Sequence, residues 1–252
     1  MSVRLVFLGT GNAFNADGRL SPALWVRPAG AAPFLVDLGP TAIAAMERCR
    51  LDASEVDRVF FTHLHGDHTA GWPFLLLRET FVSRRSRPLE VFGPAGTALQ
   101  LERLAAGSYP ELLQPAKVPF PVEVRELAVA RAEGVDAGGG LRFDVVPLEH
   151  HASSIGYRFH AGGRRVAVTG DTRWCPGLEE LSRGCDLLVV ECSSLERQAY
   201  AHVSLEELRE DASRLGAARV AIVHLTDEVA RALDERPIPG VFAAADGLEL
   251  EV

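Results

Sequence analysis

Short apolar runs, each ended by polar or glycine-rich residues, recur along almost the whole chain. Runs of this length that are rich in Val, Leu, Ile and Phe predict buried strands, at 3–8, 23–27, 34–37, 59–61, 89–92, 122–129, 141–148, 155–159, 164–169, 186–190 and 219–223. Apolar residues at helical spacing predict helices at 41–50, 69–77, 97–106 and 205–215. Two halves that each pass from strands to helices favour an α/β fold with two mixed sheets face to face and helices outside.

Local signals refine three of these segments. Ser204-x-x-Glu207 is a capping box that begins the last predicted helix. Three glycines at 138–140 predict a turn between the strands at 122–129 and 141–148. The Pro-rich segment 107–121 is irregular, and it could serve as a lid or only as a connector.

Residues of the kind that bind metals follow the apolar run 59–61 in the segment 62–68, THLHGDH. Alternation along an extended segment places its first two histidines on one face and Leu64 toward the core, and the glycine allows a turn. So many polar groups at the end of an apolar strand are costly unless something binds them, and imidazole and carboxylate groups suit zinc and its neighbours. The alternative is a surface loop rich in histidine. We predict a metal site with the local ligands His63, His65, Asp67 and His68.

Other predicted strands also end in possible ligands. His150 follows the strand at 141–148, with His151 as the less favoured neighbour because alternation points it away. Asp171 follows the strand at 164–169, and His224 follows the strand at 219–223. Asp37 ends an earlier strand, where it either orients a metal-bound imidazole or caps a helix.

Composition and charge narrow the class of protein. The chain has 252 residues, 47% hydrophobic and 24% charged, with no linker, so we expect one domain over 1–252. A formal net charge of −8 argues against a broad nucleic-acid-binding face, and the one basic run, 84–87, is expected to be a solvated loop. Four scattered cysteines, no export signal and no apolar run of membrane-spanning length predict a soluble, cytoplasmic protein. Gly9-x-Gly11 lacks a third glycine at Phe14, which argues against a dinucleotide site.

The string His63-x-His65-x-Asp67-His68 resembles the metal signature of the metallo-β-lactamase-fold hydrolases. The resemblance extends to His150-x-x-x-Ser154-x-Gly156-Tyr157, to 169–172 (TGDT) and to 223–226 (VHLT). It implies a four-layer αββα sandwich and two divalent metal ions, with Zn²⁺ expected first and Mn²⁺ as the alternative. It assigns His63, His65 and His150 to one ion, Asp67, His68 and His224 to the other, and Asp171 to both.

A further pair resembles one branch of that family. Glu191, at the end of its strand, and His202 resemble the Glu–His pair of ribonuclease Z and of the cyclic-phosphate phosphodiesterases. The resemblance implies that a metal-bridging hydroxide attacks the substrate and that His202 protonates the leaving oxygen while Glu191 orients it. We therefore assign catalytic roles to Asp67, His202 and Glu191. The alternative for His202 is a surface residue that merely precedes the helix cap.

The chain departs from ribonuclease Z in one place. The long tRNA-binding arm should lie between Gly156 and Gly170, where this sequence has room only for a hairpin with its turn at 161–163. This disfavours tRNA and favours a small phosphodiester or cyclic phosphate as substrate. Two alternatives remain, a hydrolase of carbon esters, lactones or amides at the same site and a non-catalytic metal-dependent binding protein. The resemblance is also compatible with a homodimer.

Overall fold

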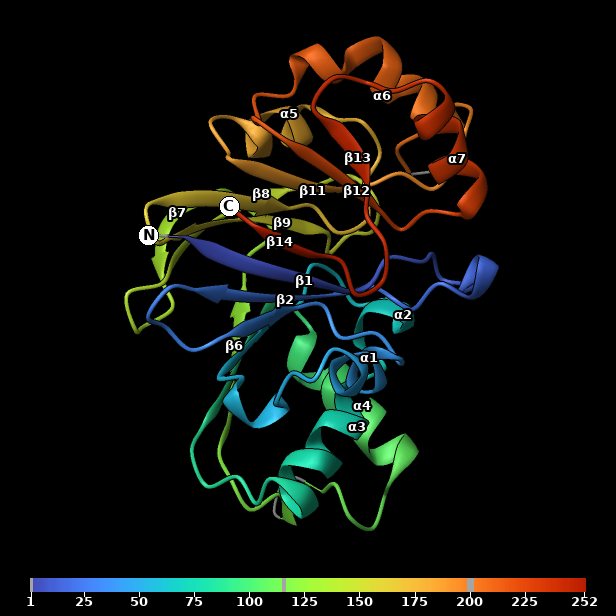
Figure 1. Cartoon of the computed structure of the whole chain (residues 1–252). Helices are drawn as coiled ribbons and strands as arrows, with labels where there is room; N and C mark the ends of the chain where they lie inside the picture. Colours follow the sequence, from blue (N-terminus) through green and yellow to red (C-terminus); the bar gives the residue numbers. More distant parts are fainter. Residues whose placement is uncertain (1, 115–116, 199–201) are drawn as a thin grey trace.

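Two β-sheets pack face to face and helices cover both outer sides (Figure 1). The computed structural model describes residues 2–114, 117–198 and 202–252. Helices α1 to α4 lie outside the first sheet, and α5 to α7 lie outside the second (Figure 1). This is the predicted four-layer αββα sandwich.

Each sheet has seven strands. The first has the order β14-β1-β2-β3-β4-β5-β6 and the second β13-β12-β11-β10-β9-β8-β7. The strands of the first sheet are β1 (Val3–Gly9), β2 (Ala23–Pro28), β3 (Phe34–Val36), β4 (Arg58–Phe60), β5 (Leu89–Pro94), β6 (Val122–Leu127) and β14 (Glu249–Glu251). Those of the second are β7 (Ala132–Asp136), β8 (Arg142–Pro147), β9 (Ile155–Ala161), β10 (Arg164–Val168), β11 (Leu187–Glu191), β12 (Val220–Val223) and β13 (Val241–Ala243).

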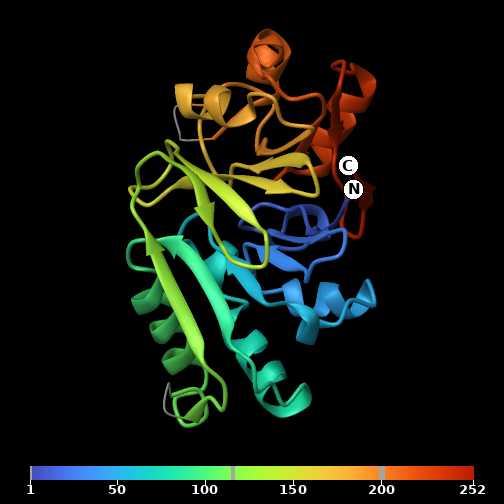
Figure 2. The same ribbon diagram turned by 90° about the vertical axis from the view of Figure 1, so that its left-hand side faces the viewer.

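The helices are short, and most have one apolar side against a sheet. They are α1 (Ala42–Arg48), α2 (Gly66–Thr69), α3 (Trp72–Leu77), α4 (Thr97–Ser108), α5 (Pro176–Ser182), α6 (Leu205–Asp211) and α7 (Asp227–Glu235). Single turns of other helix types occur at η1 (Ala16–Gly18), η2 (Ala53–Glu55), η3 (Arg78–Val82) and η5 (Ala212–Arg214). In Figure 2 the green helix α4 lies beside β5 and β6, of which β6 is an edge strand of the first sheet. The predicted capping box is present at the start of α6. The Ser204 side chain accepts a hydrogen bond from the backbone N–H of Glu207, and the Glu207 carboxylate accepts one from the backbone N–H of Ser204.

Aromatic side chains fill the space between the two sheets. The Phe60 ring lies 4.8–5.4 Å from the rings of five neighbours, which come from both sheets: Phe34, Phe92, Phe143, Tyr157 and Phe159. Burying each such ring stabilises the fold by about 1.5–3 kcal/mol. Phe60 is the last residue of β4, so this packing fixes the point from which the histidine-rich segment leaves the sheet.

The topology brings the candidate ligands to one edge of the sandwich. Strands β3, β4 and β5 are parallel in the first sheet, and β10, β11 and β12 are parallel in the second. The carboxyl ends of parallel strands meet at one edge of a sheet, which is where ligand sites form in open α/β sheets. The segments after β3, β4, β10 and β12, together with the end of β11, therefore converge.

Two local predictions about the strands are wrong. Strand β7 was not predicted, and the glycine turn at 138–140 joins β7 to β8, while β6 belongs to the other sheet. The segment Ala132–Asp136 has few apolar residues because it is a largely exposed edge strand, so it lacks the pattern of a buried one. Leu64 is half-buried outside any strand, because β4 already ends at Phe60.

The basic run 84–87 is not simply a solvated loop. Arg85 is buried, and its guanidinium lies 3.2 Å from the Glu79 carboxylate, which is also buried, and 3.1 Å from that of Asp57. The charge of Arg85 is thus compensated inside the protein.

The segment 107–121 contributes to the core. Leu113 and Phe120 are buried beneath α3 and α4. Residues 115–116 lie outside the described residues, so a lid there stays a prediction. Among the described helices, none is long and apolar enough to span a membrane.

Candidate metal centre

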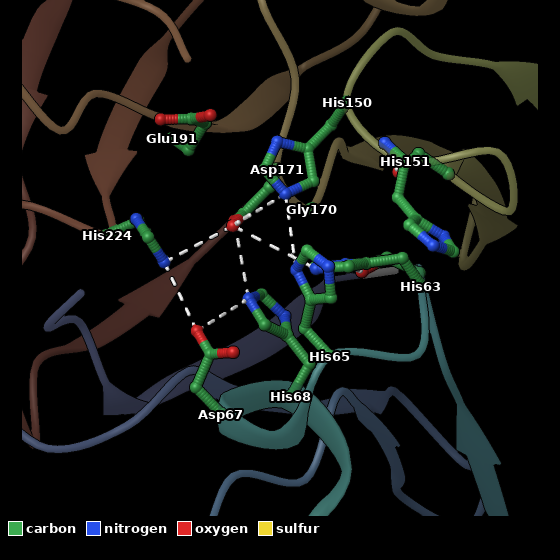
Figure 3. A network of polar contacts seen from close by, with 12 residues as sticks. His63, His65, Asp67, His68, His150, His151, Gly170, Asp171, Glu191 and His224 are labelled. Carbon is green, nitrogen blue, oxygen red and sulfur yellow. Dashed lines mark hydrogen bonds and ion pairs between the residues drawn. The ribbon is translucent and has the colours of Figure 1, made fainter. Parts of the chain in front are cut away.

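Seven side chains from four separate segments converge at the edge where the parallel strands end (Figure 3). They form two groups, and within each group the ligand atoms lie within 4.8 Å of one another. One group comprises His63, His65, His150 and Asp171, and the other Asp67, His68, Asp171 and His224. The structure therefore brings together all the residues that the sequence singled out as ligands, with Asp171 in both groups.

The spacing of the donor atoms in the second group suits a single ion. Nε2 of His68 lies 3.3 Å from Oδ1 of Asp171, and Nε2 of His224 lies 3.4 Å from Oδ2 of the same carboxylate. Both imidazoles also lie 3.4 Å from Oδ2 of Asp67. Nitrogen and oxygen atoms bound tetrahedrally to one zinc ion, each at about 2.1 Å, are about 3.4 Å apart.

The first group is slightly more open. Nε2 of His63 and Nε2 of His150 lie 3.9 and 3.8 Å from Oδ2 of Asp171, and His150 lies 3.2 Å from Nδ1 of His65. Oδ2 of Asp171 thus lies near imidazoles of both groups and Oδ1 lies near His68, so this carboxylate is placed to interact with ions in both groups.

Buried polar atoms without a hydrogen-bond partner gather here. They include Nε2 of His63, Nε2 of His68 and Oδ1 of Asp171, whose residues are at most 3% exposed. Each such atom costs about 1–3 kcal/mol when nothing satisfies it, and native proteins rarely keep several together. Bound metal ions would satisfy all three, so the residues fit a metal centre.

The pKa values of these groups differ in what they imply for metal binding. Burial, helped by the neighbouring histidines, holds the pKa of His63 well below its usual value, so His63 is neutral and able to bind a metal. Burial opposes ionisation of Asp171, but His224 and His68 hold its pKa well below the usual range. Burial also opposes the charged form of His68 and so lowers its pKa. The carboxylates of Asp171 and Asp37 outweigh this effect and raise that pKa well above normal. A metal ion that binds must displace the proton of His68.

Asp37 holds the candidate ligand His68 in place. Its Oδ2 lies 2.7 Å from Nδ1 of His68, and its Oδ1 accepts a 2.8 Å hydrogen bond from the backbone N–H of Thr62. Asp37 is buried, and Thr41, rather than Asp37, is at the N-terminus of α1. Of the two interpretations that the sequence left open, the structure thus supports the one in which this acid orients an imidazole.

The pair Glu191 and His202 lies beside both ligand groups. Nδ1 of His202 is 2.6 Å from Oε1 of Glu191, and the same oxygen accepts a hydrogen bond from the backbone N–H of Thr172. Glu191 is buried, whereas the His202 side chain is 27% exposed. The His202 ring lies 4.7 Å from that of His150 and 5.6 Å from that of His224. A half-buried imidazole held by a buried acid thus lies against a candidate ligand of each group. Residues 199–201, just before it, lie outside the described residues.

His151 has a different position from its neighbour His150. Its Nδ1 lies 2.8 Å from the hydroxyl of Ser153, its side chain is exposed, and it belongs to neither donor group. The preference of the sequence for His150 over His151 agrees with this arrangement.

Sequence reasoning missed the residues that support the ligands from behind. Gly170 has φ +64°, and a Cβ there would lie 2.3 Å from Oγ1 of Thr62, which also bonds the Asp37 carboxylate. Only glycine therefore allows the loop that carries Asp171 to pack against the segment that carries His63. The signal available in the sequence was Gly170 directly before Asp171 at the end of a strand, which could have indicated a tight turn at that point.

Comparison with known proteins gives one consistent result. Residues 33–225 match the family described as "Beta-lactamase superfamily domain". The chain is 30% identical over 252 aligned positions to a protein named Ribonuclease Z from Mycobacterium sp. (strain KMS), covering 90% of this chain and 86% of the relative.

Two solved structures share the fold. The metallo-beta-lactamase fold protein YhfI from Bacillus subtilis superimposes with a TM-score of 0.79 at 19% identity, over the full length of both chains. A diphosphatase of the PhnP family superimposes with a TM-score of 0.77 at 21% identity, covering 99% of this chain and 98% of the other. At these identities the two likenesses concern the fold alone.

Proposed function

The chain belongs to the β-lactamase superfamily and is related to ribonuclease Z, and from that premise we propose that it is a dinuclear metal-dependent phosphodiesterase. Its substrate is a small phosphodiester or cyclic phosphate. The relative named Ribonuclease Z, at 30% identity, supports this class of reaction.

The observation that carries the proposal is the placement of His202. Its ring lies against one ligand of each group, and Glu191 holds its Nδ1 at 2.6 Å, which leaves Nε2 for the substrate. An imidazole there can donate a hydrogen bond to a phosphate oxygen and a proton to the departing oxygen. Glu191 is buried and therefore acts by positioning His202 rather than by touching the substrate.

The ligand groups determine the rest of the site. Two divalent ions held there, Zn²⁺ by preference or Mn²⁺, would supply positive charge to the phosphate oxygens and would lower the pKa of the attacking water. Asp171 belongs to both groups and so fixes the distance between them. Asp37 bonds Nδ1 of His68 and keeps this imidazole in the tautomer whose Nε2 is available to a metal ion. Asp67, 13% exposed, is the ligand carboxylate best placed to orient the attacking water.

The proposed substrate is small for two reasons. Between Gly156 and Gly170 the chain forms only the β9–β10 hairpin, which leaves no arm for a large nucleic acid there. The formal net charge of −8 also argues against a broad basic surface that could bind a polyanion.

The test is the variant His202→Ala with Zn²⁺ or Mn²⁺ bound. We expect the turnover of bis-p-nitrophenyl phosphate and of cyclic nucleotides to fall about 100-fold or more, because general acid catalysis contributes that much. His160→Ala is the matched control, since His160 contacts Asp144 on β8 and not the candidate ligands. Metal content should stay the same in both variants.

Other outcomes would identify the competing functions. Fast hydrolysis of lactones or carboxylic esters that is insensitive to His202→Ala would make the protein a carbon-ester hydrolase. A metal-replete protein that turns over no phosphodiester and no ester would be a binding protein, and the proposal would be wrong.

A further inference from the structure

His151 follows a candidate ligand in the chain, yet the proposed function gives it no role. Its ring centroid lies 5.3 Å from that of His65, with 60° between the ring planes. Both side chains are exposed, so together they border an open side of the candidate metal centre. A ring in this position is one imidazole away from the ion that His65 would bind.

Four imidazole rings contact one another in series along this side of the site. The centroids are 4.7 Å apart between His202 and His150, 5.0 Å between His150 and His65, and 5.3 Å between His65 and His151. The two inner rings are candidate ligands of the first group, whereas His202 and His151 stand at the two ends of the series. Figure 3 shows His151 on the side of the site away from His224.

The turn that carries His151 is held in place by hydrogen bonds. The N–H of His151 donates to Oγ of Ser154 at 3.0 Å, and the N–H of Ser154 donates to the His151 carbonyl at 2.9 Å. The next N–H, that of Ile155, donates to the carbonyl of Thr62, the residue before His63. The turn is therefore fixed against the segment that carries the first candidate ligands.

Ser153 determines which nitrogen of the His151 ring can donate. Nδ1 of His151 lies 3.3 Å from the backbone nitrogen of Ser153 and 2.8 Å from its hydroxyl. A backbone N–H can only donate, so Nδ1 is an acceptor and the hydrogen of the neutral ring is on Nε2. The ring thus presents an N–H donor on the side away from its own turn.

We propose that His151 is a substrate-binding residue whose Nε2–H donates a hydrogen bond to a phosphate oxygen, on the side of the first ligand group. The inference rests on the proposed function and adds to it a second imidazole contact, at the other end of the series from His202. A phosphodiester has enough oxygens to meet two ions and both imidazoles at once, whereas a carboxylic ester has only its carbonyl and alkoxy oxygens. His151 thereby favours phosphodiesters over carboxylic esters.

The test measures the dissociation constant of inorganic phosphate for the metal-replete protein by calorimetry. We expect His151→Ala to weaken phosphate binding about tenfold, because it removes one hydrogen bond to a charged group. His151→Gln keeps a donor and should stay within about threefold of the unaltered protein. Ser153→Ala removes the hydroxyl that holds the ring and should give an intermediate loss.

Two further measurements separate a substrate contact from a structural role. Metal content should be the same in every variant, because His151 belongs to neither ligand group. The loss of bis-p-nitrophenyl phosphate turnover in His151→Ala should appear mainly in KM, whereas that in His202→Ala should appear in kcat. His160→Ala is the matched control for phosphate binding, since His160 contacts Asp144 on β8.

Three results would overturn the inference. They are an unchanged phosphate affinity in His151→Ala, a lower metal content in that variant, and equal losses of affinity in His151→Ala and His151→Gln. If His202→Ala loses turnover while His151→Ala keeps its phosphate affinity, this inference alone is wrong. A protein that hydrolyses no phosphodiester but loses phosphate affinity in His151→Ala would contradict the proposed function and leave the phosphate contact in place.

Discussion

Asp171 belongs to two of the three donor groups found among the described residues, whereas the third comprises Glu191, His202 and His224. The charge of Asp171 is compensated by His224 and His68, which hold its pKa low against the effect of burial. Asp171 is therefore the residue whose substitution tests whether the two groups bind two ions.

The variant Asp171→Asn keeps the shape of this side chain and removes its charge. We expect metal content to fall from about two ions per chain to one or fewer, because an amide is a poor bridge between cations. Elemental analysis after dialysis measures this. Asp186→Asn is the control, since Asp186 bonds Arg164 at the far end of the same sheet. A full complement of metal in Asp171→Asn would show that Asp171 is not a ligand.

At the scale of the element, the strand ends were easier to predict than the strand partners. The motif 62–68 and the residues after 148, 170 and 223 identified the ends of apolar runs correctly, because a ligand side chain interrupts a buried pattern. The pairing of β7 with β8 was missed because an exposed edge strand has no such pattern. Nothing in the sequence singled out Asp144 on β8, although its carboxylate contacts Arg158 and His160 in the structure.

Asp144 gives a prediction about the second sheet. Its carboxylate lies 3.0 Å from Arg158 and 2.9 Å from His160 on β9, and it accepts a bond from Gly134 on β7. Burial opposes its ionisation, but these three partners lower its pKa. The carboxylate therefore stabilises the folded protein above the unfolded pKa of about 3.9, and this stabilisation is lost as the pH falls through the folded value.

We expect Asp144→Asn to lower the free energy of unfolding by about 1–3 kcal/mol at pH 7, and the difference from the unaltered protein to shrink toward pH 3. Denaturant titrations of both metal-free proteins at several pH values measure it. Asp234→Asn, on the exposed side of α7, is the control and should have no effect at any pH. A difference that is constant down to pH 3 would contradict the electrostatic explanation.

For the whole molecule, the candidate metal centre joins the two sheets. His63, Asp67 and His68 follow β4 of the first sheet, whereas Asp171 and His224 follow strands of the second. Ions held between them cross-link the two halves of the sandwich in the folded state only. Binding that is specific to the folded state stabilises it by mass action.

Removal of the metal should therefore lower the melting temperature. Free metal at about 100 times its dissociation constant adds about 2.7 kcal/mol for each site, which corresponds to about 5–10 °C in a chain of this size. Differential scanning fluorimetry with a chelator, and again after Zn²⁺ is restored, measures the change. Asp171→Asn should show a smaller shift, and a melting temperature indifferent to chelation would argue against a structural contribution from the metals.

The sequence by itself was enough to predict a cluster of metal-binding side chains and the class of fold. Imidazoles and carboxylates at the ends of apolar runs can be recognised locally, because a buried strand cannot otherwise tolerate them. The spacing 63–68 and the resemblance that it carries gave the αββα sandwich and the ligand set, which the structure brings together. The same local rule failed at Arg85, whose burial depends on Glu79 and Asp57.

Only the tertiary structure decided which groups face one another. Three arrangements depend on contacts between segments far apart in the chain. Asp37 orients His68, Gly170 leaves room for the Thr62 side chain, and His202 lies against candidate ligands of both groups. The exposure of Phe14 was likewise not readable from the sequence, since a phenylalanine in an apolar-rich chain is expected inside. Such contacts arise from sheet pairing and packing, to which distant residues contribute jointly, so no local pattern records them.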